Sequence, residues 1–223
     1  MPARDVFELL DRARALGGST LAELAQRTRT AMPIDPRRAK GFVGELVERA
    51  MGAARSSRPE PDFAALGVEL KTLPIGDDGQ PRESTFVCTV PRAELEAPWE
   101  RSRVRHKLAR VLFVPVEASP AVAHAARRVG SAFVWSPDAD EEATLRADWE
   151  ELSGLLLASG HEHVSARHGR ALQLRPKGAN AAARVRACDA DGAPMMALPR
   201  AFYLRRTFVA SILAQQGLAT PAR

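Results

Sequence analysis

The sequence predicts a mixed α/β protein, because segments with strand periodicity alternate with segments with helix periodicity. Between Leu66 and Leu73, apolar residues recur at every second position, which is typical of a half-buried strand. Residues 40–52 and 138–159 instead place their apolar side chains on one side of a helix. A chain of 223 residues that is 45% hydrophobic is long enough for one domain, or for two lobes that share a core.

The N-terminal part of the chain has helical patterns. Residues 5–16 and 20–28 predict short amphipathic helices, and Thr20 with Glu23 matches a capping box for the second helix. Residues 40–52 predict a third helix. Its apolar stripe would be formed by Phe42, Val43, Leu46, Val47 and Ala50.

Strand patterns dominate the middle of the chain. After the strand predicted over 66–73, residues 76–83 are rich in turn formers. Residues 84–90 predict a second strand, and we expect it to pair with the first as a hairpin. The apolar runs at 110–117 and 133–135 are suited to buried strands.

The C-terminal part mixes both patterns. Residues 138–159 predict a helix with an acidic start, whose inward face would carry Leu145, Trp149, Leu152, Leu155 and Leu156. Residues 171–177 alternate as a strand and end in a basic tip, whereas residues 179–187 look helical. Residues 205–217 predict a last helix that a glycine ends.

Asp62, Glu69 and Lys71 are the candidate catalytic residues. Asp62 follows a proline, and Glu69 and Lys71 flank Leu70. Since successive side chains of a strand point to opposite faces, Glu69 and Lys71 share one face. Two carboxylates beside an ammonium can bind a divalent metal and activate a water next to a phosphate, as a metal-dependent nuclease requires. The alternative is an exposed strand with an ordinary ion pair, which contributes little stability.

Basic residues are concentrated in the last part of the chain. Residues 161–223 contain ten basic and three acidic residues, whereas the other 160 residues contain 22 basic and 24 acidic ones. This distribution favours nucleic-acid binding, with an ordinary solvated surface as the alternative. No apolar run approaches the ~20 residues needed to span a membrane, and the first residues lack a signal-peptide profile. We therefore expect a cytoplasmic protein that does not associate with membranes.

Lysine is rare in this chain, since 28 of its 32 basic residues are arginine. An ammonium is compact, titratable and a point donor, whereas a guanidinium is planar and permanently charged. Positions that remain lysine are therefore candidates for chemistry that a guanidinium cannot perform. They are Lys40, Lys71, Lys107 and Lys177.

Other catalytic and metal-binding motifs are weak or missing. His161, His163 and His168 lie close together in sequence, but they form no HExxH motif and no cysteine lies nearby, so a zinc site is disfavoured. The sequence contains no GxSxG nucleophile elbow and no GxxxxGK phosphate-binding loop.

Sequence blocks from about Leu9 to the last helix occur in the order seen in a known family. The blocks are KGFVGELVERAMG, PDFAALGVELKTLP, ESTFVCTV, SRVRHKLARVLFVPVE, RRVGS with VWSP, LRADWEEL, ARHGRALQLRPK and LPRAFYLRRTF. On these residues the chain resembles the MutH family, the strand-nicking endonucleases of methyl-directed mismatch repair. That family belongs to the PD-(D/E)xK nuclease superfamily.

The resemblance implies a restriction-endonuclease-like fold, a mixed sheet flanked by helices with two lobes around a DNA-binding cleft. A single MutH-like domain would cover residues 1–223, with an N-terminal lobe of roughly 1–105 and a basic, DNA-reading lobe of roughly 106–223. The resemblance also implies Mg²⁺-dependent incision of the unmethylated strand at a hemimethylated GATC site. The enzyme would act as a monomer on double-stranded DNA, with MutL as its activator.

The resemblance assigns catalytic roles residue by residue. Asp62 and Glu69 match the metal-binding carboxylates, and the backbone carbonyl of Leu70 matches a further metal ligand. Lys71 matches the catalytic lysine, and Lys107 matches the second active-site lysine. Whether one or two metal ions bind, and whether Lys71 is itself the base, stays open.

Helix 40–52 and its flanks carry further matches and departures. Periodicity places Glu45 and Glu48 on the solvent side of this helix, yet Glu48 matches the helix glutamate of the family site. Lys40 matches a lysine near the DNA. Ala39 stands where the family commonly has an acid, Glu45 replaces a residue that is usually apolar, and the segment between Val90 and Trp99 is shorter than in the best-known members.

The DNA-binding residues implied by the resemblance lie in the basic segment. Arg175, Pro176 and Lys177 match the base-reading loop, and Tyr203 matches a tyrosine near the adenine. The alternatives are a stand-alone GATC-specific restriction-type endonuclease and a non-catalytic DNA-binding module. The intact Asp62, Glu69 and Lys71 argue against the non-catalytic module.

Overall fold

The computed structural model contains α-helices and mixed β-sheets, which confirms the predicted mixed α/β class. It describes residues 3–35, 41–53, 60–159, 167–177, 185–188 and 193–218. Within these ranges, no helix is both long enough and apolar enough to cross a lipid bilayer.

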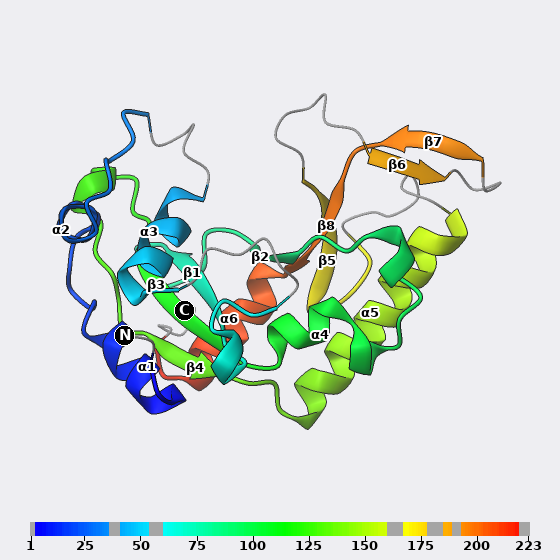
Figure 1. Ribbon diagram of the computed structural model, residues 1–223, viewed down its shortest axis with the longest axis horizontal. Coiled ribbons are helices and arrows are strands. Elements are labelled where there is room, and N and C mark those ends of the chain that lie inside the picture. The colour runs from blue at the N-terminus through cyan, green and yellow to red at the C-terminus, as the bar shows by residue number, and fades with distance from the viewer. Residues whose placement is uncertain are drawn as a thin grey trace. The chain divides into compact units, whose positions relative to one another are not determined.

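The chain divides into two compact units, and each is built from separate stretches of sequence (Figure 1). Unit 1 consists of Met1–Glu83, Ala109–Ser136 and Ile212–Arg223. Unit 2 consists of Ser84–Leu108 and Pro137–Ser211. The chain therefore passes from one unit to the other several times.

The helices predicted at the start of unit 1 are confirmed. They are α1 (Val6–Arg14), α2 (Leu21–Arg27) and α3 (Phe42–Met51). The capping box at the start of α2 forms in both directions, since the Thr20 side chain accepts from the Glu23 N–H and the Glu23 carboxylate accepts from the Thr20 N–H. These bonds satisfy donors that a helix end would otherwise leave unpaired.

The sheet of unit 1 has the strand order β1–β3–β4. Its strands are β1 (Glu69–Ile75), β3 (Val111–Glu117) and β4 (Phe133–Trp135). β1 is parallel to β3, and β4 is antiparallel to β3. Val111 to Val114 on β3 are each 0% exposed, because a central strand is covered on both faces and can only accept an apolar run. The two predicted strands at 110–117 and 133–135 are therefore confirmed.

Apolar side chains of the helices and of the sheet form the core of unit 1. Its buried members include Leu9, Leu21, Leu24, Leu46, Val47, Leu70, Leu112 and Val114. The predicted stripe of α3 is correct for Leu46 and Val47, which are buried, while Phe42, Val43 and Ala50 are partly buried against the core.

The predicted hairpin between residues 66–73 and 84–90 is wrong. β1 pairs with β3, whereas β2 (Thr85–Cys88) lies in unit 2 and pairs with β8 (Arg200–Leu204). After β1 the chain turns back and forms a single bridge between Ile75 and Pro81. The Gly76 N–H donates to the Gln80 carbonyl and the Arg82 N–H donates to the Pro74 carbonyl on either side of this bridge. Pro74 has no N–H with which to return the next bond, so the returning chain leaves β1.

The start of the first predicted strand is also corrected. The strand expected from Leu66 begins at Glu69, because Ala64–Leu66 form the 3₁₀ helix η2. Gly67 follows with φ +62°, in the left-handed region. The apolar alternation before Glu69 therefore belongs to a turn.

The sheet of unit 2 has the order β2–β8–β5, and all its pairs are antiparallel. β5 (Leu172–Pro176) confirms the strand predicted at 171–177. Other elements of this unit are η3 (Arg92–Glu94), η4 (Trp99–Arg101), α4 (Arg103–Leu108) and α5 (Ala139–Ser159). α6 (Arg206–Gln215) closes the described chain, and Gly217 follows it with φ +66°, as predicted. η5 (His124–Ala126) belongs to unit 1.

The long helix α5 has the cap and the buried face that the sequence predicts. Asp138 accepts from the Glu141 N–H, and Glu141 accepts from the Asp138 N–H. Of the five side chains expected to face inward, four are buried, and Leu155 is partly exposed. The buried ones are Leu145, Trp149, Leu152 and Leu156.

The helix predicted over residues 179–187 is wrong where the structure describes it. β6 (Val185–Cys188) is a strand that pairs with β7 (Pro194–Ala197) as an antiparallel ribbon. The remaining residues of that prediction lie outside the described ranges. The strand partner comes from later in the sequence, so local helix propensity does not decide the conformation here.

Asp148 fixes α5 to the start of β5. Its side chain is buried, and its two oxygens accept three backbone N–H groups, from Arg170 at 2.8 Å, Ala171 at 2.6 Å and Leu172 at 2.7 Å. Hydrogen bonds to a carboxylate are stronger than those between neutral groups. They also satisfy donors that the strand itself leaves unpaired.

We predict that Asp148→Asn lowers the free energy of unfolding by about 2–4 kcal/mol. The asparagine amide keeps the shape of the aspartate side chain but has only one acceptor oxygen. Its NH₂ group would face backbone N–H groups that also donate. The control is Asp140→Asn, at an exposed position in the first turn of the same helix, which should cost less than about 1 kcal/mol. Urea denaturation of both variants measures the difference, and equal losses would contradict the role of Asp148.

Candidate active site

A short turn brings Asp62 to the start of β1. Phe63 and Val68 exchange both backbone hydrogen bonds, with N···O distances of 2.9 and 3.3 Å. The chain between them closes through η2 and Gly67. Glycine adopts the φ of +62° at position 67 without the strain that a Cβ causes for most other residues.

The carboxylate of Asp62 is held by the backbone of β1. Its Oδ2 accepts from the N–H of Leu70 at 2.9 Å. The N–H of the preceding residue, Glu69, donates to the Arg110 carbonyl at 3.0 Å on the side of β3. Because successive N–H groups of a strand point in opposite directions, the Leu70 N–H faces the open edge of the sheet, where Asp62 supplies its acceptor.

Glu69 and Lys71 share one face of β1, which confirms the alternation predicted from the sequence. The Lys71 Nζ lies 2.6 Å from the Glu69 Oε1. The side chain of Glu69 is 2% exposed and that of Lys71 is 15% exposed. The pair is therefore largely removed from water, where the loss of one member of an ion pair destabilises a fold strongly.

Glu48 belongs to the same electrostatic environment. Burial raises the pKa of the Glu48 carboxyl, and the negative charge of Asp62 raises it further, whereas Lys71 opposes these effects. The charges of Glu69 and Glu45 also raise this pKa. Periodicity placed Glu48 on the solvent side of α3, but it is partly buried because α3 packs against β1. Glu45 is exposed, as predicted.

The donor set suits a hard divalent cation. Asp62 and Glu69 offer carboxylate oxygens and Leu70 offers a backbone carbonyl. Mg²⁺ binds through one or two carboxylates and keeps several waters. The pKa of Glu48 is raised mainly by burial and secondarily by the charge of Asp62, and a bound cation would offset only the effect of that charge. In the part of the chain that the structure describes, no group of three or more His, Cys, Asp or Glu side chains is arranged to hold a metal. The metal-binding roles therefore stay predictions.

Of the other predicted catalytic and loop residues, the structure describes Lys107 but not Lys40. Lys107 is on α4 in unit 2, where it is 8% exposed. Lys40 lies outside the described residues, as do His161 and His163. His168 is described, and its Nδ1 lies 3.1 Å from the Glu151 carboxylate, in an ion pair when the imidazole is protonated.

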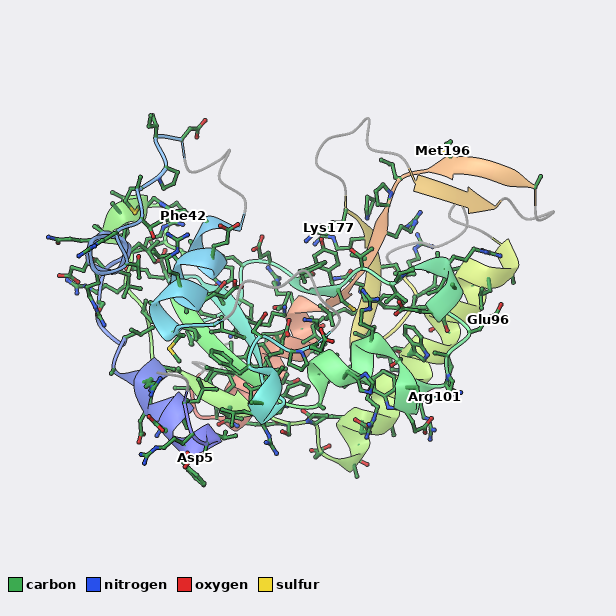
Figure 2. The ribbon with its side chains drawn as sticks, in the orientation of Figure 1. Asp5, Phe42, Glu96, Arg101, Lys177 and Met196 are labelled. Carbon is green, nitrogen blue, oxygen red and sulfur yellow. The ribbon has the colours of Figure 1, made fainter. Side chains whose placement is uncertain are left out.

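The predicted DNA-reading residues gather on the sheet of unit 2. Tyr203 on β8 is paired with Gln173 of β5, two residues before Arg175. The guanidinium carbon of Arg175 lies 5.7 Å from the centre of the Tyr203 ring, within the range of a cation–π contact. Arg175, Pro176 and Lys177 are exposed at the end of β5, where Figure 2 shows Lys177.

Phe86 on β2 joins this group, although its sequence pattern did not predict it as a site residue. Its ring is 5.5 Å from that of Tyr203 in an edge-on arrangement, and the Lys177 Nζ lies 3.1 Å from its centre. The backbone N–H of Lys177 also donates to the Pro199 carbonyl at 2.7 Å. The sequence feature that bears on Phe86 is the alternation of STFVCTV. It places Phe86 on one face of a sheet, but it does not show that β8 is the neighbouring strand.

Comparison with known proteins identifies close relatives. The family model "DNA mismatch repair enzyme MutH" matches residues 51–148. The chain is 50% identical over 218 residues to the DNA mismatch repair protein MutH of Yersinia pseudotuberculosis serotype IB (strain PB1/+), covering 97% of this chain and 96% of that protein. The MutH proteins of Yersinia pestis (strain Pestoides F) and Yersinia enterocolitica serotype O:8 have the same identity and coverage.

We predict that Gly67→Ala lowers the free energy of unfolding by about 1–2 kcal/mol, because alanine is strained in the left-handed region. A Cβ at this position would meet no atom within 4 Å, so steric clashes with neighbouring residues do not contribute to the expected loss of stability. The matched variant is Gly67→Asn, because asparagine tolerates this conformation, and it should lose less stability than Gly67→Ala. Equal losses in guanidinium denaturation would show that the backbone conformation is not the cause.

Proposed function

Since the chain belongs to the MutH family of DNA mismatch repair enzymes, we propose that it nicks the unmethylated strand at hemimethylated GATC sites. The reaction is hydrolysis of a phosphodiester, and Mg²⁺ is the cofactor. The observation that carries the proposal is the grouping of Asp62, Glu69 and Lys71 at the start of β1, within the electrostatic range of Glu48.

Asp62, Glu69 and the carbonyl of Leu70 would hold the metal. A bound divalent cation supplies Lewis-acid polarisation of the phosphate and neutralises negative charge. The Asp62 carboxylate is positioned for this role because Oδ2 is already oriented by the Leu70 N–H.

Lys71 would contribute a positive charge beside the reacting phosphate. Its ammonium is held by Glu69 and carries further protons that can be donated. It would orient the attacking water or stabilise the charge that develops on the phosphoryl oxygens. Lys107 and Glu48 are proposed as the accompanying active-site residues, by their match to the family.

Sequence and methylation would be read by the residues of unit 2. Arg175 and Lys177 present two donors on either side of the rigid Pro176, a geometry suited to base edges in a groove. The hydroxyl of Tyr203 would bond the bare exocyclic amine of adenine and would clash with the methylated one. We also propose that Lys40 contacts the DNA. MutL would activate the enzyme, which would act as a cytoplasmic monomer.

A nicking assay tests the proposal. Unmethylated, hemimethylated and fully methylated GATC duplexes are incubated with and without Mg²⁺ and with and without MutL. We expect incision of unmethylated strands only, dependence on Mg²⁺ and a higher rate with MutL. An incision rate that is the same with and without MutL would favour the stand-alone restriction-type enzyme. DNA binding without any incision would favour the non-catalytic module.

We predict that Lys71→Arg reduces nicking at least tenfold, which corresponds to about 1.4 kcal/mol or more in the activation barrier. The larger planar guanidinium cannot replace a compact ammonium beside a buried carboxylate. Thermal unfolding and DNA affinity are measured as controls and should change little. A variant that keeps more than about a tenth of the parent rate would contradict the catalytic role.

We predict that Tyr203→Phe narrows the rate difference between unmethylated and hemimethylated sites. The substitution keeps the ring contacts with Phe86 and Arg175 and deletes only the hydroxyl. One lost hydrogen bond in a desolvated site changes discrimination by about 1–3 kcal/mol. The ratio of the two nicking rates is the measurement, and an unchanged ratio would exclude the hydroxyl as a methylation sensor.

A further inference from the structure

Gln173 is a polar side chain that is buried in the sheet of unit 2, where it is 7% exposed. Leu172 and Leu174 on either side of it point to the opposite face, where Leu174 is paired with Phe202 and the ring of Trp149 on α5 lies 5.2 Å from that of Phe202. A buried strand position usually carries an apolar residue. An amide at such a position loses its hydration and needs a hydrogen-bond partner.

The carboxamide of Gln173 makes a hydrogen bond that spans the sheet. Its Nε2 donates to the Ser84 Oγ at 2.5 Å. Gln173 lies on β5 and Ser84 directly precedes β2, and these strands lie on opposite sides of β8. Since neighbouring strands are about 4.8 Å apart, the bond passes over β8. Asp148 and Ser153, by contrast, are buried polar side chains whose hydrogen bonds go to the backbone.

This hydrogen bond crosses β8 beside Tyr203. Gln173 and Phe86 are paired with Tyr203 from the two sides, and residues directly opposite in an antiparallel sheet share a face. Ser84 lies two positions before Phe86, so alternation places it on that face as well. The Tyr203 ring therefore has three neighbours on this face, namely the Phe86 ring at 5.5 Å, the Arg175 guanidinium carbon at 5.7 Å and the Gln173–Ser84 bond.

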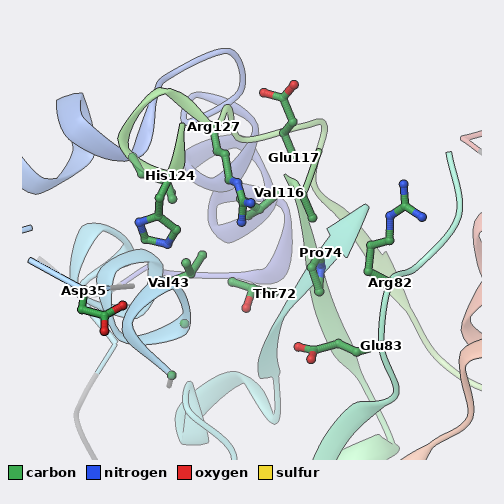
Figure 3. A pocket seen from close by; sticks show the side chains of 14 residues that line it. Asp35, Val43, Thr72, Pro74, Arg82, Glu83, Val116, Glu117, His124 and Arg127 are labelled. Carbon is green, nitrogen blue, oxygen red and sulfur yellow. The ribbon is translucent and has the colours of Figure 1, made fainter. Parts of the chain in front are cut away.

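The backbone ladder with β8 gives β2 few constraints of its own. β2 is four residues long, lies at an edge of the sheet, and shifts its register between Phe86 and Cys88. Ser84 is also the first residue of unit 2, since Glu83 belongs to unit 1, where it lines a cavity of about 780 Å³ (Figure 3). A side-chain bond at Ser84 therefore fixes the start of β2 relative to β5.

We propose that Gln173 is a positioning residue for Tyr203. By bonding Ser84 over β8, its amide fixes the outer strands on both sides of the Tyr203 ring and holds the ring in the orientation that reads DNA. This inference rests on the proposed function, in which Tyr203 senses adenine methylation, and it names the side chains that orient the sensor. Without the bond the ring would populate further orientations, and DNA would bind only the competent fraction.

Tyr203 is the only tyrosine of the chain, so ¹³C-labelled tyrosine gives nuclear magnetic resonance signals from this residue alone. Gln173→Leu and Ser84→Ala each remove the hydrogen bond from one end. We expect both to shift the ring signals of the DNA-free protein in the same direction, whereas Ser84→Thr keeps the hydroxyl and should retain the parent signals. Unchanged signals in Gln173→Leu and Ser84→Ala would overturn the proposal.

Ser153→Ala is the matched control for Ser84→Ala, because it deletes the same group from unit 2. The buried Ser153 hydroxyl donates to the Trp149 carbonyl within α5 at 2.6 Å. Its loss should lower the melting temperature without moving the Tyr203 signals. Thermal unfolding of every variant shows that it is folded. An equal shift in Ser153→Ala and Ser84→Ala would attribute the shift to lost stability and would also overturn the proposal.

Nicking of a GATC duplex measures the consequence for DNA. One net hydrogen bond changes an equilibrium by a factor of about 2–10, so Gln173→Leu and Ser84→Ala should each raise KM about fivefold. Because bound DNA selects the competent orientation, kcat should change less than about twofold. The double variant should match either single variant, since both substitutions delete the same bond. A lower kcat at the parent KM, or effects that multiply in the double variant, would contradict the positioning role.

The signals of Tyr203 are measured without DNA, so the two proposals fail in different ways. If the signals shift as expected but the parent nicks no GATC site, Gln173 still orients Tyr203 and the proposed reaction fails. If the parent nicks as proposed and the signals do not move, only the positioning role of Gln173 fails.

Discussion

The hydrogen bond from the Leu70 N–H to the Asp62 carboxylate is the contact on which the candidate active site depends. It joins residues eight positions apart, and the intervening turn is closed by the Phe63–Val68 backbone bonds. β1 is an edge strand in its sheet, so its outward N–H groups need acceptors. The Asp62 carboxylate accepts from one of these N–H groups and is thereby held beside Glu69. The same hydrogen bond therefore satisfies a donor of the edge strand and positions a candidate catalytic residue.

Much of the fold could be predicted because local periodicity and tertiary burial agree. The helix at 138–159 and the strand at 110–117 are examples, since each buries the face that its pattern indicates. Strand pairing could not be predicted in the same way. Ile75 and Pro81 begin a hairpin that Pro74 cannot extend because its nitrogen carries no hydrogen. β6 is a strand because residues 194–197 pair with it. Such pairing is set by distant segments, which a local pattern does not contain.

In the candidate site, too, local patterns predicted some features, whereas contacts with distant segments decided others. Alternation predicts that Glu69 and Lys71 share a face, and they form an ion pair there. The partial burial of Glu48 could not be predicted from helix periodicity, which identifies the side facing the main core but not a second contact with β1. Phe86 was missed for a related reason, because its importance comes from Tyr203 and Lys177, which lie far away in the sequence.

The scarcity of lysine now has a physical explanation at the positions described. Lys71 places an ammonium 2.6 Å from a carboxylate that is 2% exposed, in a space that a planar guanidinium would overfill. Lys177 places its Nζ 3.1 Å from the centre of the Phe86 ring, a distance that a compact cation reaches directly. Lys107 is 8% exposed on α4, where burial favours the smaller group. In a chain that otherwise uses arginine, these three lysines lie at a buried ion pair, against an aromatic ring and on a buried part of a helix. Their functional roles stay predictions.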